Sequence, residues 1–492
     1  MSTRASQISR QDTPRAEDVR RRAMQSVFVA WMFGAFWMHV TGGMAQTRLA
    51  KLLQLPPFGY GVLAAVPFAG ALLQLPTSYF IDRYGHHKRV FVASGIIHRA
   101  LWIAIGLIPW LLTGWWSWAV LLGGVFLSAA ANNVASPVWV LWMSELVPPR
   151  IRGRFFSLRS QAGQMVGLVV TVGVGWLLDH AAAHGGRMPQ GIIALLFAVA
   201  GIAGITDFLL FLRVPPPVAR PAREGVSLLA MVREPLADRN FRRFLGFIAT
   251  MTFGTAFTGQ FIWLFLFDVA QMSNTRASIL FGVVPLVLAM IAARVWGRVL
   301  DRVGRKPVLT ICSLCVIHGA FAWVFVQGPH WWLGYIGIVI VSMAWPGVEF
   351  ANFNMLLSMG DSMRGRRHGS SYVAISSFVT ALSGMVSGFF GGAVAQWVGD
   401  WHATVCGYML TYHAVLLFLS MGIRASALLW VWKLEEPRAC GTRQALVYLG
   451  SSALANLASF ADLVALPGRL LIRMGQWTYR VTPGAGWIRR RK

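Results

Sequence analysis

Charged side chains are scarce in this chain of 492 residues: they make up 13% of it, whereas apolar residues make up 56%. A soluble domain carries roughly 25% charged residues. A water-soluble fold could not bury so much apolar surface, so the composition excludes an ordinary soluble domain. Cysteine is scarcer still, with 4 residues, and this excludes a disulfide-dense secreted scaffold.

Acidic residues are much rarer than basic ones, with 18 Asp and Glu against 44 Lys and Arg, and the formal net charge is +26. In a soluble protein this excess would suggest a nucleic-acid partner. Here the basic residues gather in alternate connections between apolar blocks, as is typical of loops on the cytoplasmic side of a membrane. Arg48, Lys51, Arg187 and Arg276 are the exceptions. No basic arm with interleaved aromatics stands apart from the blocks, so we expect no nucleic-acid partner.

Long uncharged blocks are abundant, and we count twelve along the chain. About 20 residues suffice to cross a hydrocarbon core of about 30 Å. The blocks predict an all-α polytopic membrane protein with 12 transmembrane helices in two six-helix bundles. The predicted parts are a cytoplasmic tail (1–23), an N-terminal bundle (24–212), a cytoplasmic linker (213–243), a C-terminal bundle (244–432) and a cytoplasmic tail (433–492). We expect an amphipathic helix on the inner surface in the last part, with a further span as the alternative.

An internal repeat relates the two bundles. Three dipeptides recur in order: Phe33-Gly34 as Phe253-Gly254, Val66-Pro67 as Val284-Pro285, and Asp82-Arg83 as Asp301-Arg302. Their offsets are 220 (253 − 33), 218 (284 − 66) and 219 (301 − 82) residues. Because this offset spans six blocks, the halves are predicted to be parallel repeats.

The connection between the eighth and ninth blocks carries a distinctive motif. It reads Gly297-Arg298-Val299-Leu300-Asp301-Arg302-Val303-Gly304-Arg305-Lys306. Its counterpart between the second and third blocks keeps Asp82, Arg83 and Gly85, and Lys88 follows two histidines. A tight turn between two spans needs a residue that tolerates positive φ, such as Gly85 or Gly304, and the flanking cations hold it in the cytoplasm.

This motif resembles the signature loop of the major facilitator superfamily, G-x-L-x-D-R-x-G-R-K. The resemblance implies a secondary transporter, not an enzyme, that moves a small solute by rocking its two bundles alternately open. It also implies that the loops latch the cytoplasmic side of the outward-open state. Asp82 would then face Arg366, and Asp301 would face Arg154. The alternative is that the loops are only positive-inside turns.

Polar residues inside the blocks are the candidates for binding substrate or a coupling ion, because such groups are costly in lipid and usually functional. They are Glu349, Asn132, Asn133, His39, Gln260, Asp207 and Arg99. The resemblance favours those on helices 1, 4, 7 and 10, and Glu349 is the first choice, with a packing role as the equal alternative. We expect Arg99 to pair with Asp207 or to extend toward the inner surface.

The remaining expectations follow from this assignment. The protein is expected to be a multi-pass protein of a bacterial inner membrane, with both termini cytoplasmic, working as a monomer on a small-molecule substrate, with protons as an optional coupling ion. No cofactor or metal is expected, because Cys312, Cys315 and His318 are too few for a structural zinc site. Helix 4 lacks the arginine, and helix 5 the Gly-Pro element, of drug–proton exchangers. A transporter-like scaffold or sensor and a membrane-embedded lipid-linked transferase remain the alternatives.

Overall fold

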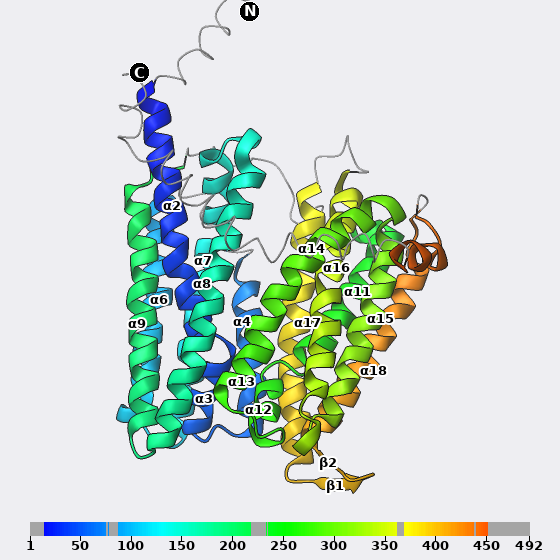
Figure 1. Ribbon diagram of the computed structural model, residues 1–492. Coiled ribbons are helices and arrows are strands. Elements are labelled where there is room, and N and C mark those ends of the chain that lie inside the picture. Colours follow the sequence, from blue (N-terminus) through cyan, green and yellow to red (C-terminus); the bar gives the residue numbers. More distant parts are fainter. Residues whose placement is uncertain are drawn as a thin grey trace, which may run out of the picture.

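The computed structural model describes residues 14–74, 77, 87–217, 233, 235–361, 369–436 and 439–450. Asp82, Arg83, Gly85 and Arg366, together with most of the predicted linker and tail, lie outside the described residues. The described chain folds into two helical bundles that stand side by side (Figure 1).

The first bundle holds the helices of the N-terminal half. They are α2 (Pro14–Thr41), α3 (Gly43–Leu52), α4 (Pro57–Leu72), α6 (His87–Leu111), α7 (Trp115–Leu146), α8 (Pro149–His184), α9 (Met188–Leu210) and the short η1 (Phe211–Arg213). Within it α6 packs against α7 and α9, and α2 packs against α8 and α9.

The second bundle repeats this arrangement. Its elements are α11 (Arg239–Ala256), α12 (Phe261–Asp268), α13 (Asn274–Ser278), η2 (Ile279–Val283), α14 (Val284–Val303), α15 (Arg305–Phe321), η3 (Ala322–Phe325), η4 (Gly328–His330), α16 (Leu333–Asp361), α17 (Gly369–Val398) and α18 (Tyr412–Lys433). Before α18 an antiparallel hairpin of β1 (His402–Val405) and β2 (Tyr408–Thr411) projects from the bundle, with His402 opposite Thr411.

Among the described residues, 11 helices are long and apolar enough to cross a membrane, and the shorter apolar α4 makes twelve. The predicted fold class, an all-α polytopic membrane protein of two bundles, is confirmed. The first helix of the C-terminal half starts earlier than residue 244, the predicted start of that bundle. It begins at Arg239, because Asp238 caps the helix by accepting hydrogen bonds from the backbone N–H groups of Asn240 (2.8 Å) and Phe241 (3.2 Å).

The first helix of each half is broken near one end. In the N-terminal half α2 stops at Thr41, Gly43 adopts a φ of +47°, and the short α3 follows. In the C-terminal half α11 stops at Ala256 and the short α12 follows after a turn. The repeat seen in the sequence therefore extends to the interruptions of its helices.

Two lysines make the same contact in the two halves. The ammonium group of Lys88, at the start of α6, donates to the carbonyl oxygen of Val214 at 2.7 Å, just after α9 and η1. The ammonium group of Lys306, at the start of α15, donates to the carbonyl oxygen of Leu434 at 2.7 Å, just after α18. The lysines are 218 residues apart (306 − 88) and the acceptors 220 (434 − 214). In each half, the lysine fastens the third span to the end of the sixth.

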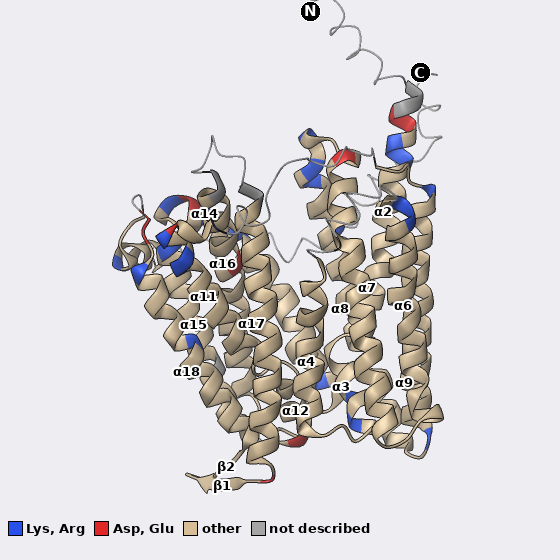
Figure 2. Ribbon diagram, turned by 180° about the vertical axis from the view of Figure 1, so that it is seen from behind, with Lys and Arg blue, Asp and Glu red and all other residues tan. Residues whose placement is uncertain are grey.

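The two halves meet most closely at the end of the molecule that carries the β-hairpin, where α4 packs against α17 and α8 against α13 (Figure 1). At the α4 crossing a Cβ on Gly61 would lie 2.4 Å from the Cα of Gly392 and 2.5 Å from the carbonyl oxygen of Gly388. Only glycine lets the backbones approach this closely. The opposite end carries most of the Lys and Arg residues in Figure 2, as the charge pattern of the sequence predicts.

Candidate functional site: a cavity between the two halves

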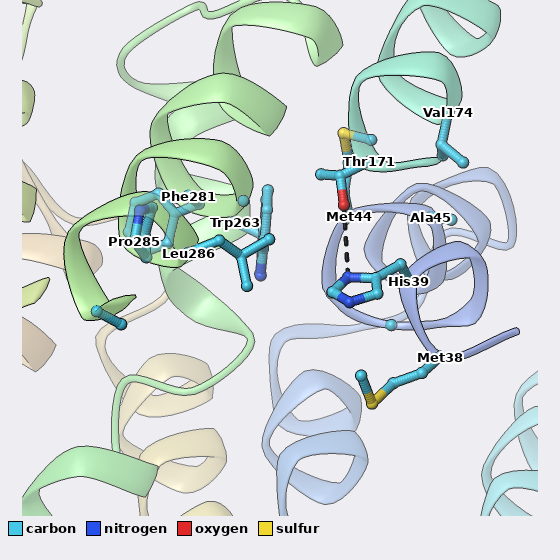
Figure 3. Close-up of a pocket in the computed structure, with 14 residues that line it drawn as sticks. Met38, His39, Met44, Ala45, Thr171, Val174, Trp263, Phe281, Pro285 and Leu286 are labelled. Carbon is cyan, nitrogen blue, oxygen red and sulfur yellow. Dashed lines mark hydrogen bonds between the residues drawn. The ribbon is translucent and has the colours of Figure 1, made fainter. Parts of the chain in front are cut away.

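A cavity of about 400 Å³ lies between the halves. Its walls come from α2, α3 and α8 on one side and from α12, η2 and α14 on the other. Figure 3 shows His39, Thr171 and Met44 on the first side, with Trp263 and Phe281 among the residues opposite them. A site that both halves line is one whose shape changes when the halves tilt.

His39 is the one titratable side chain among the described residues that line this cavity. Its Nδ1 lies 3.5 Å from the hydroxyl of Thr171 on α8. The ring also fills the space beside Gly167, where a Cβ would lie 2.2 Å from Nε2. The other lining residues are largely apolar and aromatic, as in most small-molecule sites.

The remaining sequence candidates do not gather around this cavity. Gln260 accepts a hydrogen bond from the hydroxyl of Thr47 at 2.9 Å and so joins the halves directly. Glu349 is exposed and accepts from the indole N–H of Trp345 on its own helix at 2.8 Å. Asn133 donates to the carbonyl oxygen of Ala129, also on its own helix, at 2.9 Å, and Asn132 lines a different cavity.

Arg99 and Asp207 form a buried ion pair inside the N-terminal half. Their nearest atoms, Nη2 and Oδ2, are 3.3 Å apart, and the residues are 6% and 7% exposed. The pairing considered from the sequence is thus the one observed. Gly34 makes room for the carboxylate, since a Cβ there would lie 2.5 Å from its Oδ2. The guanidinium carbon of Arg99 lies 3.6 Å from the ring centroid of Trp37, a close cation–π contact.

An ionic and hydrogen-bonded contact closes the hairpin end between the halves. The carboxylate of Asp179, on α8, accepts four hydrogen bonds of 2.6 to 2.9 Å from the backbone and side chains of Asn274 and Thr275, at the start of α13. Arg48 Nε donates to the side-chain oxygen of Asn274 at 2.6 Å, and Lys51 pairs with Asp268. Arg48 and Lys51 were exceptions to the charge pattern of the sequence, and these contacts account for them. Asp179 is not among the site residues predicted from the sequence.

The signature loop has the predicted turn but also a partner that the sequence did not reveal. Gly304 adopts a φ of +93°. The carboxylate of Glu436, after α18, accepts hydrogen bonds from the backbone N–H groups of Arg305 (3.0 Å) and Lys306 (2.7 Å), and thereby caps α15. The neighbouring Glu435 accepts from Arg243 at 2.5 Å, and this hydrogen bond holds the pKa of Glu435 below its usual value.

One of the two predicted latch pairs, Asp301 and Arg154, lies within the described residues and makes no direct contact in this conformation. Asp301 and Arg154 are both exposed, and neither makes a hydrogen bond or ion pair with another described residue. The guanidinium of Arg302 lies 5.4 Å from the ring centroid of Tyr448. Gly297 has open space where a Cβ would be.

Comparison with known proteins identifies the family. The model of the Major Facilitator Superfamily matches residues 26–387. The chain belongs to the Major Facilitator Superfamily. This membership makes it an integral multi-pass membrane protein of a family of secondary transporters, which are not enzymes.

Individual relatives are distant. A niacin transporter of Acinetobacter baylyi is 26% identical over 197 residues, which are 38% of this chain and 40% of that protein. A variant of the nucleoside transporter NupG superposes with a TM-score of 0.63 at 10% identity, over 85% of this chain and 100% of that one. A D-xylose–proton symporter gives 0.60 at 14% identity, over 84% and 98%. At such identities the structural matches establish the shared fold only.

Proposed function

We propose that the protein binds its solute in the cavity between the halves and carries it across a bacterial inner membrane by alternating access. The observation that carries this proposal is that α2 and α8 face α12 and α14 across a cavity of about 400 Å³. The halves, 24–212 and 244–432, tilt about this cavity, with the linker 213–243 as a cytoplasmic tether. As a transporter of this kind, the protein works as a monomer in the bilayer and needs no catalytic group.

The conformation described is, in this proposal, the inward-open one. We assign the Lys- and Arg-rich end (Figure 2) to the cytoplasmic side, and both termini with it. The hairpin end is then the outer side, which Asp179 and Lys51 hold closed through their contacts with α13 and α12. The separation of Asp301 from Arg154 supports this reading, because the latch belongs to the outward-open state.

His39 is the proposed coupling group. A histidine changes charge near neutral pH and can carry a proton with each transport cycle. We keep Glu349 as the second candidate, since it is a carboxylate exposed in the helix equivalent to α7 of the other half. The niacin transporter suggests the first solute to assay, and the nucleoside and xylose carriers suggest the next classes.

Uptake into proteoliposomes with and without a pH gradient tests the proposal. Protein that carries a solute should lose uptake when Trp263→Ala opens the wall of the cavity, while Trp397→Ala, on the 86%-exposed Trp397, should leave it unchanged. His39→Gln should keep binding but lose the response to the gradient. A protein that binds a solute yet never moves it across the bilayer would favour the scaffold alternative.

A further inference from the structure

A second cavity, of about 300 Å³, lies inside the N-terminal half. Helices α2, α6, α7, α8 and α9 contribute to its walls. The residues that line it include the buried pair Arg99 and Asp207 and the exposed Asn132 on α7. The cavity therefore runs from a charged interior to an accessible rim.

This cavity holds more positive than negative charge. It contains the guanidinium groups of Arg99 and Arg159 and the single carboxylate of Asp207. Arg99 pairs with Asp207, whereas Arg159 forms no ion pair with a described residue. Two guanidinium groups share one carboxylate, so the cavity carries an excess of positive charge that favours an anion as a further partner.

Several N–H groups in this cavity lack partners. Nε and Nη1 of Arg99, Nε of Arg159 and the indole N–H of Trp31 are buried, and none has a hydrogen-bond acceptor among the described residues. Buried polar groups are nearly always satisfied, and each exception calls for an explanation. Donors around the cavity therefore outnumber acceptors, and this imbalance favours an acceptor-rich ligand, such as a carboxylate, beside Arg159.

Aromatic rings flank the free arginine. The guanidinium carbon of Arg159 lies 4.1 Å from the ring centroid of Trp31 and 5.0 Å from that of Trp139. Such cation–π contacts fix the position of the guanidinium, and a guanidinium can pair with a planar, two-oxygen acceptor through two N–H groups. The indoles also offer faces on which an aromatic ring of a ligand can stack.

The position of this cavity relates it to the cavity between the halves. Trp31 and His39 are both on α2, and Arg159 and Thr171 are both on α8. At about 1.5 Å per residue, the two cavities are offset along these helices by roughly 12 to 18 Å. Since both helices start at the Lys- and Arg-rich end, the arginine cavity is the nearer of the two to the inner side.

We propose that the arginine cavity binds a small organic anion that carries a carboxylate on a planar ring. The carboxylate lies against Arg159, and the ring stacks on Trp31 or Trp139. Because the arginine cavity lies toward the inner side, such a solute would bind there on its way between the central cavity and the cytoplasm. This part of the inference rests on the proposed function. Binding itself does not require that the protein transports.

Calorimetric titration of the purified full chain with three matched probes tests the inference. The probes are benzoate, benzamide (neutral, same ring) and cyclohexanecarboxylate (same charge, no aromatic ring). Benzoate should bind, and both other probes should bind about tenfold or more weakly, since each removes one of the two recognised features. Failure of the parent protein to bind benzoate, or equal binding of benzoate and benzamide, would overturn the inference.

Variants then assign the binding to this cavity. Arg159→Gln should weaken benzoate at least about tenfold, and Arg159→Lys should weaken it less, because the charge remains while the paired N–H geometry is lost. Arg150→Gln, at an exposed position near the start of the same helix, should bind like the parent. The melting temperature of each variant separates lost binding from lost folding. Full benzoate affinity in a folded Arg159→Gln protein would place the anion elsewhere and refute the inference.

The transport assay separates this inference from the proposed function. Benzoate binding without uptake of any tested solute would refute the carrier proposal and leave the anion site intact. Uptake of a solute by protein that does not bind benzoate would refute the anion site and leave the carrier proposal intact.

Discussion

The carboxylate of Asp179, near the end of α8, accepts hydrogen bonds from both the backbone N–H and the hydroxyl of Thr275 in α13, at 2.9 and 2.6 Å. Asp179 belongs to the N-terminal half and Thr275 to the C-terminal half. A negative charge at the start of a helix is also favoured by the helix dipole. This contact therefore ties the halves together at the hairpin end.

Asp179→Asn should loosen this closure. The amide keeps the shape but loses the charge, and hydrogen bonds to a charged acceptor contribute about 1.5–3 kcal/mol. We expect a several-fold larger population of molecules in which the two halves are separated at the hairpin end. Electron–electron resonance distances between spin labels at the exposed positions His184 and Gln271 would measure it, after replacement of the exposed Cys406 and Cys440 by serine.

Asp400→Asn is the matched control for this experiment, because Asp400 is an exposed aspartate beside the hairpin at the same end. It should leave the label distances unchanged. The same distance distribution in the Asp179 variant and the parent would show that this contact does not hold the halves together.

Gly388→Leu should disrupt the crossing of α4 and α17. Even a Cβ at Gly388 would lie 2.7 Å from the backbone nitrogen of Ala65, and overpacking typically costs 1–3 kcal/mol. Uptake by equal amounts of reconstituted protein should fall strongly. Gly123→Leu, where a Cβ meets nothing within 4 Å, should be tolerated. Equal uptake by the two variants would mean that this crossing is not a critical contact.

Gly167→Ala and Gly173→Ala on α8 should have opposite effects on stability. Alanine is favoured over glycine in a helix by up to about 1 kcal/mol, so Gly173→Ala, with open space around it, should raise the melting temperature. Gly167→Ala should lower it, because the new Cβ would lie 2.2 Å from Nε2 of His39. It should also reduce uptake. A rise in melting temperature for both variants would show that His39 moves aside freely.

Lys88→Ala and Lys306→Ala should destabilise the protein by similar amounts, since each removes the equivalent lysine-to-carbonyl hydrogen bond from its own half. The expected loss is about 1.5–3 kcal/mol apiece, and the two losses should add because the sites share no partner. Thermal unfolding in detergent would measure them. Lys433→Ala, at an exposed position at the end of α18, serves as control and should have little effect.

The sequence was sufficient to predict features that repeat or that cost energy in lipid. The spacing of apolar blocks predicted the fold, and the repeat predicted the equivalence of the Lys88 and Lys306 loops. The pairing of Arg99 with Asp207 could be anticipated because opposite charges in apolar helices are expected to neutralise each other. Periodicity gave less help with Glu349, since a helix that is apolar on every side does not indicate which face turns inward.

The contacts that the sequence did not reveal join distant segments. Asp179 and Thr275 are 96 residues apart in the sequence. Glu436, which caps α15, is 130 residues from Lys306, the residue whose backbone N–H donates to it. Both are single carboxylates near helix ends, and nothing in the local sequence names their partners. The arginine cavity was missed for a similar reason. In the sequence Arg159 closely follows Arg150, Arg152 and Arg154, and only the fold sets it beside Trp31 and Trp139.

The interrupted first helices have a consequence for how the halves meet at the outer side. Lys51 lies on α3 and Asp268 on α12, so both members of this ion pair sit on short pieces beyond the breaks at Gly42 and Phe257. Each piece is attached to its long helix through a turn instead of an unbroken ladder of backbone hydrogen bonds. At this ion pair the halves therefore meet through two short segments whose position is set by the packing around them, since the side chains of Leu49 on α3 and Leu266 on α12 are fully buried.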